Sequence, residues 1–234
     1  MTTECSFHWP DIGRITGPCI RPGGIALTNR ALDACGLPPG ARVADIGCGA
    51  GGTLGHLERA GLFRPVGLDC SEMLLREALP RLVPGRLVRG LAEALPFKSG
   101  SFDALFCECV LSVVDERAAA LGEFGRVLKN DGFLVMSDVF ASDNPGRPQH
   151  GPGAQPDPNG LLRRDDLLGL LAGCGFSTVL WEEHKRLLKE FAARMILAGA
   201  CLPAQWRRAR GISYFLLVAR KSSSAARRRK TWMA

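Results

Sequence analysis

The chain has 234 residues, of which 46% are apolar, enough to build the core of one large domain or two small ones. No apolar run approaches the roughly 20 residues that span a bilayer, and the N-terminus lacks the apolar stretch of a secretory signal. We therefore expect a folded cytoplasmic protein rather than a disordered, exported or membrane-spanning one.

Positive charge is concentrated at the C-terminus. The net charge is +7, but residues 221–234 hold five positive charges and no acidic residue, so the rest of the chain carries only +2. We expect these residues to form a disordered basic tail, and the nearly neutral remainder does not indicate a nucleic-acid partner.

The cysteines do not form a recognisable framework. There are nine of them, an odd number at scattered spacings, and no Cys-x-x-Cys pair. We expect reduced thiols, with neither disulfides nor a metal site.

The predicted elements alternate between helices and strands. After an irregular stretch at 1–22, a helix is expected at 25–35 and ends before the Pro-Pro-Gly at 38–40. Ser71 and Asp115 are expected to cap two later helices. The remaining elements predicted up to residue 140 are strands at 41–47, 65–69, 86–90, 102–108 and 133–140, and helices at 53–61, after Ser71 and at 116–128.

The alternation breaks at 143–160, where five prolines and four glycines forbid regular structure, and a loop of this length is usually functional or mobile. Four more elements follow: helices near 164–172 and 183–199, and strands near 176–181 and 212–220. Such alternation predicts a doubly wound, mostly parallel sheet in a three-layer αβα arrangement.

We interpret the chain as one domain over 1–220, followed by the basic tail at 221–234. Within the domain, 1–36 form an N-terminal segment and helix, and 141–163 form a loop on the substrate side of the site.

A glycine cluster, VADIGCGAGG at 43–52, follows the strand predicted at 41–47. Glycines allow a tight turn and a close approach of the backbone to a ligand at a helix N-terminus. Asp69 ends the next strand, where a carboxylate can accept both ribose hydroxyls of a nucleoside. Asp45 precedes the first glycine, where a pyrophosphate would be repelled, so the pair favours a cofactor with a cationic amino-acid end.

At this point the sequence resembles the class I S-adenosylmethionine-dependent methyltransferases of the methyltransferase type 11, quinone-biosynthesis-like kind. VADIGCGAG and VGLDCSEML resemble their first two motifs, GLAEALPF and SFDALFCECVLSVVD the third and fourth, and EFGRVLKNDGFLVMSD the segment leading into the fifth strand. The match runs in unbroken order over roughly 40–140, with local similarity to arsenite methyltransferases.

The resemblance implies a Rossmann-like seven-stranded sheet with an antiparallel last strand, and S-adenosyl-L-methionine as the cofactor. Leu91 replaces an aspartate that many relatives carry in the third motif, so other groups would have to hold the adenine amino group. The expected cofactor-binding residues are Asp45, Gly47, Cys48, Gly49, Gly51, Asp69, Cys70, Ala92, Glu93 and Cys107.

The acceptor side is expected at the end of the strand at 102–108, because ligands in open α/β sheets lie beyond the carboxyl ends of the strands. Glu108 would bind a cationic substrate group or accept a proton, and His150 in the long loop is a second candidate base. Cys109 falls where arsenite methyltransferases place an arsenic-binding thiolate, although the loop at 141–163 lacks their further cysteine. A buried apolar cysteine is the competing interpretation.

The leading hypothesis is therefore methyl transfer from S-adenosylmethionine to a small-molecule acceptor by in-line displacement. The alternatives are an arsenite or thiol-bound metalloid methyltransferase using Cys109, a noncatalytic protein that binds S-adenosylmethionine or a nucleoside, and an RNA methyltransferase.

Overall fold

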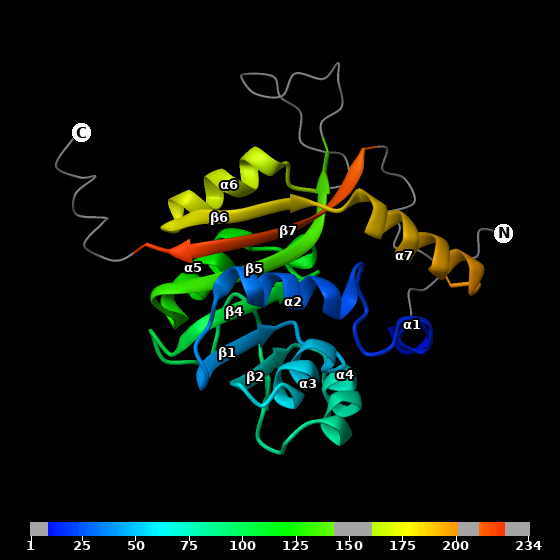
Figure 1. Cartoon of the computed structure of the whole chain (residues 1–234), viewed down its shortest axis with the longest axis horizontal. Coiled ribbons are helices and arrows are strands. Elements are labelled where there is room, and N and C mark those ends of the chain that lie inside the picture. Colours follow the sequence, from blue (N-terminus) through cyan, green and yellow to red (C-terminus); the bar gives the residue numbers. More distant parts are fainter. Residues whose placement is uncertain (1–8, 143–160, 201–210, 223–234) are drawn as a thin grey trace.

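Seven strands form the middle layer of the fold (Figure 1). The computed structural model describes residues 9–142, 161–200 and 211–222, without the side chains of 9–11. The strands are β1 (Ala41–Ile46), β2 (Phe63–Asp69), β3 (Leu87–Arg89), β4 (Phe102–Glu108), β5 (Leu128–Ala141), β6 (Phe176–Glu183) and β7 (Ile212–Lys221). Their order is β3-β2-β1-β4-β5-β7-β6. Only β7 runs antiparallel to its neighbours β5 and β6. The predicted doubly wound sheet with an antiparallel last strand is confirmed.

Helices cover both faces of the sheet (Figure 1). They are α1 (Trp9–Thr16), α2 (Gly24–Cys35), α3 (Gly52–Arg59), α4 (Glu72–Ala78), α5 (Arg117–Val127), α6 (Arg164–Gly173) and α7 (Lys185–Leu197), with 3-10 turns at η1 (Leu79–Arg81) and η2 (Leu111–Val113). One apolar core contains buried residues of α5 and α6, and a second contains those of α2, α3 and α7. None of the helices in the described ranges is long and apolar enough to cross a membrane.

The N-terminal stretch is more regular than predicted. The expectation of an irregular segment over 1–22 is wrong, because α1 forms there and packs Ile12 against Phe191 and Met195 of α7. Pro10 stands in the first turn of the helix, where a proline removes no intrahelical hydrogen bond. Packing on α7, which lies far along the chain, stabilises a helix that is too short to form on its own.

Two further local predictions differ from the structure. Strand β5 starts at Leu128, five residues before the predicted strand, because Leu128 pairs with Phe102 of β4 ahead of a register shift that precedes the Phe133 pair. Asp115 does not cap α5; the N-cap position is Glu116, which makes no side-chain cap hydrogen bond. The predicted Ser71 cap is confirmed, since the Ser71 hydroxyl accepts a hydrogen bond from the Leu74 N–H at 3.3 Å.

Three expectations fall outside the described residues. They concern His150, most of the loop at 141–163 and the basic tail beyond Ser222.

Candidate functional site

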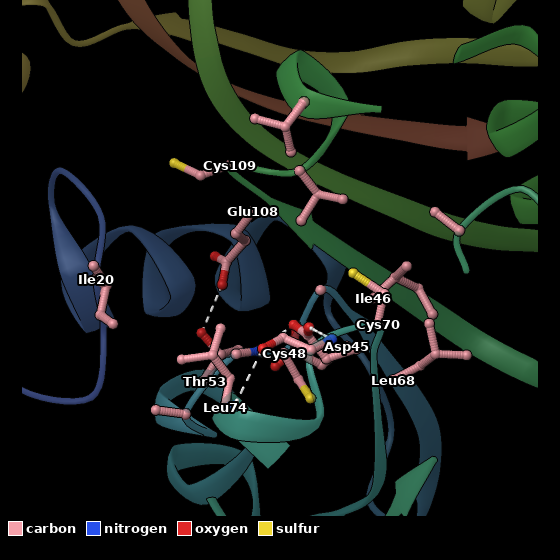
Figure 2. A pocket seen from close by; sticks show the side chains of 18 of the residues that line it. Ile20, Asp45, Ile46, Cys48, Thr53, Leu68, Cys70, Leu74, Glu108 and Cys109 are labelled. Carbon is pink, nitrogen blue, oxygen red and sulfur yellow. Dashed lines mark hydrogen bonds between the residues drawn. The ribbon is translucent and has the colours of Figure 1, made fainter. Parts of the chain in front are cut away.

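A cavity of about 420 Å³ opens at the carboxyl ends of β1, β2 and β4, which is within the size range of small-molecule sites (Figure 2). The chain leaves β1 toward β2 on one side and reaches β4 on the other, so the cavity lies where the direction of winding reverses. Its walls come from the segment at 18–21, the glycine turn after β1, the ends of the three strands, and the segments at 90–93 and 109–115.

The glycine turn fits closely against the segment after β4. Gly47 has a φ of 73°, in the left-handed region that favours glycine. A Cβ at this position would lie 2.2 Å from Cγ2 of Val110, a separation that atoms do not tolerate. Gly47, Cys48 and Gly49 line the cavity, whereas Gly51 lies behind it as the N-cap of α3. The turn can therefore present its backbone to a ligand.

Asp69 ties the ends of two strands together at the cavity wall. Its Oδ2 accepts the Gly49 N–H and its Oδ1 accepts the Ser71 N–H, both at 2.8 Å. The residue is 8% exposed. Each oxygen of an ionised carboxylate can accept a second hydrogen bond. The side chain is thus held rigidly in a position where it can receive two hydroxyl donors.

Asp45 is a buried carboxylate in the cavity wall, and one of its oxygens lacks a hydrogen-bond partner among the described residues. The residue is 3% exposed, and the oxygen in question is Oδ2. Burial, with a smaller contribution from Glu108, raises the pKa of Asp45 well above its ordinary value. A cationic group would remove this penalty, so the site fits the ammonium end of an amino-acid-like ligand.

A buried ion pair also lines the cavity. Glu108, at the end of β4, approaches Arg21 Nη2 to 2.9 Å, and both side chains are 5% exposed. Thr53 donates to Glu108 Oε2 at 2.6 Å, and Thr28 lies between Arg21 and Glu108 Oε1 (Figure 2 shows Thr53 and Glu108). Sequence reasoning found Glu108 but missed Arg21 and Thr53, because nothing local to either residue indicates a partner so far along the chain.

Cys109 follows Glu108 with an unusual backbone. Its φ of 58° is rare for a residue other than glycine. Its Sγ lies 3.1 Å from the hydroxyl of Tyr214, which donates to Ser137 Oγ at 3.0 Å. Burial, together with Asp138, raises the thiol pKa well above its ordinary value, so the side chain is a neutral thiol.

The other predicted residues divide between the cavity and the core. Cys48, Cys70, Ala92 and Glu93 line the cavity. Cys107 does not: it is fully buried in the core beneath α5 and α6, because alternate residues of β4 point to opposite faces of the sheet. The exposed Leu91 also lines the cavity mouth. No cluster of three or more His, Cys, Asp or Glu side chains within the described ranges is placed to hold a metal ion.

Known proteins resemble the part of the chain that builds this cavity. Residues 44–136 match the family described as "Methyltransferase domain". A demethylmenaquinone methyltransferase of Renibacterium salmoninarum is 38% identical over 107 residues, covering 46% of this chain and 45% of that protein. The chain spans about half or less of the length of the first curated relatives it matches.

Solved structures share the whole fold. A [4+2]-cyclase, SpnF, superposes with a TM-score of 0.72 and 24% identity over 92% of this chain and 93% of its own. Phosphoethanolamine N-methyltransferase 2 of Haemonchus contortus, in complex with S-adenosyl-L-methionine, gives a TM-score of 0.71 with 18% identity, over 91% of this chain and 56% of its own. The match over residues 44–136, the ordered motifs and the shared seven-stranded sheet make this chain similar to the class I S-adenosylmethionine-dependent methyltransferases.

Proposed function

We propose that the protein transfers a methyl group from S-adenosylmethionine to a small-molecule acceptor. The observation that carries the proposal is the pair of rigid carboxylates at one end of the cavity, Asp45 and Asp69. In this proposal Asp45 binds the ammonium group of the cofactor, Asp69 binds the ribose hydroxyls, and the wall at 90–93 receives the adenine. Bound S-adenosylmethionine supplies an electrophilic methyl group on a sulfonium, which an acceptor atom displaces in line.

The residues of the chain contribute mainly by positioning. Holding two reactants in line supplies roughly 7–11 kcal/mol of the barrier lowering, so little further catalysis is required. Glu108 lines the same cavity, where it can receive a proton or a hydrogen bond from the acceptor (Figure 2). Cys109 and Val110 add apolar wall beside it.

Binding of S-adenosylhomocysteine, the product form of the cofactor, tests the proposal. Calorimetry should detect binding by the full chain, and Asp69→Ala should weaken it at least about tenfold, since hydrogen bonds to a charged group contribute roughly 1.5–3 kcal/mol. A folded sample that binds NADH but not S-adenosylhomocysteine would contradict it. A screen with labelled S-adenosylmethionine across quinols, amines, thiols, arsenite and tRNA then identifies the acceptor class.

The arsenite alternative receives little support from the geometry around Cys109. A metalloid site needs converging thiolates, whereas this side chain is a neutral thiol hydrogen-bonded to Tyr214. The same fold is found in a protein named as a [4+2]-cyclase, so the fold alone does not separate methyl transfer from the noncatalytic alternative. Binding of the cofactor without turnover of any compound in the screen would favour it.

A further inference from the structure

Glu108 and the segment at 18–21 line one side of the cavity, and Glu108 is close enough to Asp45 to raise the pKa of that carboxyl. We call this side the acceptor end and define it as Ile20, Arg21, Glu108 and Cys109, all of which line the cavity. Figure 2 shows Ile20, Glu108 and Cys109 on one side, apart from Asp45, Leu68 and Cys70 on the other. If the cofactor occupies the second side, as proposed above, the acceptor end meets the substrate.

The described lining of the cavity is strongly acidic. It contains five carboxylates and a single basic side chain, that of Arg21. The carboxylates belong to Asp45, Asp69, Glu93, Glu108 and Asp115. Charges of one sign inside a recess with low-dielectric walls reinforce one another, so this lining attracts cations and repels anions.

Arg21 is held in place by partners within the protein, which limit what it can offer a ligand. Its Nη2 pairs with Glu108 and also reaches the Thr28 and Thr53 hydroxyls, while its Nη1 donates to the Gly24 carbonyl at 2.7 Å. Turning the Nη2 group of Arg21 toward an anion would break a buried ion pair and leave Glu108 without its partner, which is strongly unfavourable.

Glu108 retains room for one more donor. Its Oε1 is shared by Arg21 and Thr28, whereas Oε2 accepts only the Thr53 hydroxyl among the described residues. We propose that the acceptor end takes a molecule that is neutral or cationic near its reacting atom and that donates an N–H or O–H hydrogen bond to Glu108, and that it excludes acceptors with an anionic group there. This inference rests on the proposed function and narrows its substrate class.

Three probes of similar size and different charge test the inference. Benzylamine is a cation at neutral pH, benzyl alcohol is a neutral donor, and benzoate is an anion. Their binding to the full chain saturated with S-adenosylhomocysteine is measured by ligand-observed NMR. Benzylamine and benzyl alcohol should each bind about tenfold more tightly than benzoate, the difference that one hydrogen bond to a charged group makes.

Two variants should move the preference in opposite directions. Glu108→Gln leaves Arg21 as an unpaired cation, so benzoate should gain on benzylamine by about tenfold. Arg21→Gln leaves Glu108 unpaired, so benzylamine should gain instead. Glu182→Gln is the matched control, because Glu182 forms an equivalent pair with Arg30 at 2.7 Å on the surface and should leave the preference unchanged. General loosening of the structure cannot produce opposite shifts.

The inference is overturned if benzoate binds as tightly as benzylamine, if none of the three probes binds the saturated protein, or if the two variants shift the preference in the same direction. The proposed function fails separately, through lack of S-adenosylhomocysteine binding in the unmodified protein. The two failures are therefore distinguishable within one experiment.

Discussion

Gly52 begins α3 and lies directly beneath the N-terminal segment at 18–21, which makes it a sharp test of how the cavity is built. A Cβ at this position would lie 2.4 Å from the Pro18 carbonyl oxygen and 2.6 Å from Cys19 Sγ. The backbone oxygen cannot turn aside as a flexible side chain can. Gly52→Ala should therefore push the segment away from α3, and with it Arg21, whose partner is Glu108.

The expected cost follows from two opposing effects. Overpacking a well-filled site costs about 1–3 kcal/mol, while alanine gains roughly 0.5–1 kcal/mol over glycine in a helix. Gly52 does not have a positive φ, so no backbone strain is added. Gly52→Ala should lower the free energy of unfolding by about 1–2 kcal/mol in urea denaturation followed by circular dichroism, and should weaken S-adenosylhomocysteine binding.

Gly122→Ala is the control, because Gly122 lies on the exposed side of α5 with no atom within 4 Å of a new Cβ. This substitution should stabilise the protein by about 0.5–1 kcal/mol and leave binding unchanged. If the Gly52→Ala protein is as stable as the Gly122→Ala protein and binds S-adenosylhomocysteine equally well, the segment at 18–21 is not a fixed wall of the cavity.

Three further predictions concern ionisable and thiol groups that line the cavity or contact its lining. The pKa of Asp45 in the folded protein is raised above its ordinary value of 3.8. As the pH rises from about 4 through the raised pKa, the ligand-free protein should therefore become less stable relative to the Asp45→Asn variant. Saturating S-adenosylhomocysteine should reverse that order at neutral pH in thermal denaturation, and equal stabilisation of both proteins would contradict the role of Asp45. Cys70, which is exposed in the cavity wall, should be alkylated by iodoacetamide before Cys48 and Cys109, whose pKa values are raised by burial, and bound S-adenosylhomocysteine should protect it in mass spectrometry. Tyr214→Phe should cost about 1–3 kcal/mol in the free energy of unfolding, because the buried Ser137 hydroxyl loses its donor.

Elements whose boundaries depend on residues close by in the sequence could be predicted from the sequence. The strand ending at Asp69 and the helix capped by Ser71 depend on hydrophobic pattern and on a side chain a few residues away, and both form as expected. Helix α1 could not be predicted, because its stability comes from packing on α7 rather than from its own residues. The early start of β5 depends on the neighbouring strand in the same way.

The same division applies to the candidate site. Asp45 lies two residues before the glycine turn and Asp69 ends the next strand, so their placement at the cavity follows from strand ends and spacing. Thr53 and Thr28 reach Glu108 across 55 and 80 residues, and only the folded chain brings them together. Cys107 and Cys109 stand on either side of Glu108 and were expected together near the cofactor, yet the pleat of β4 sends Cys107 into the core.

The closing of the cavity by the N-terminal segment explains why the glycine run extends to Gly52. Gly47 is required by its positive φ and by Val110, a residue that follows β4, whereas Gly52 is required by Pro18 and Cys19, which precede the domain's first strand. Each of the two glycines therefore allows a different segment of the chain to pack closely against the turn and form a wall of the cavity. Since Arg21 anchors the second wall to Glu108, the segment before β1 helps to define the acceptor end, and changes at 18–21 should alter acceptor preference as well as cofactor binding.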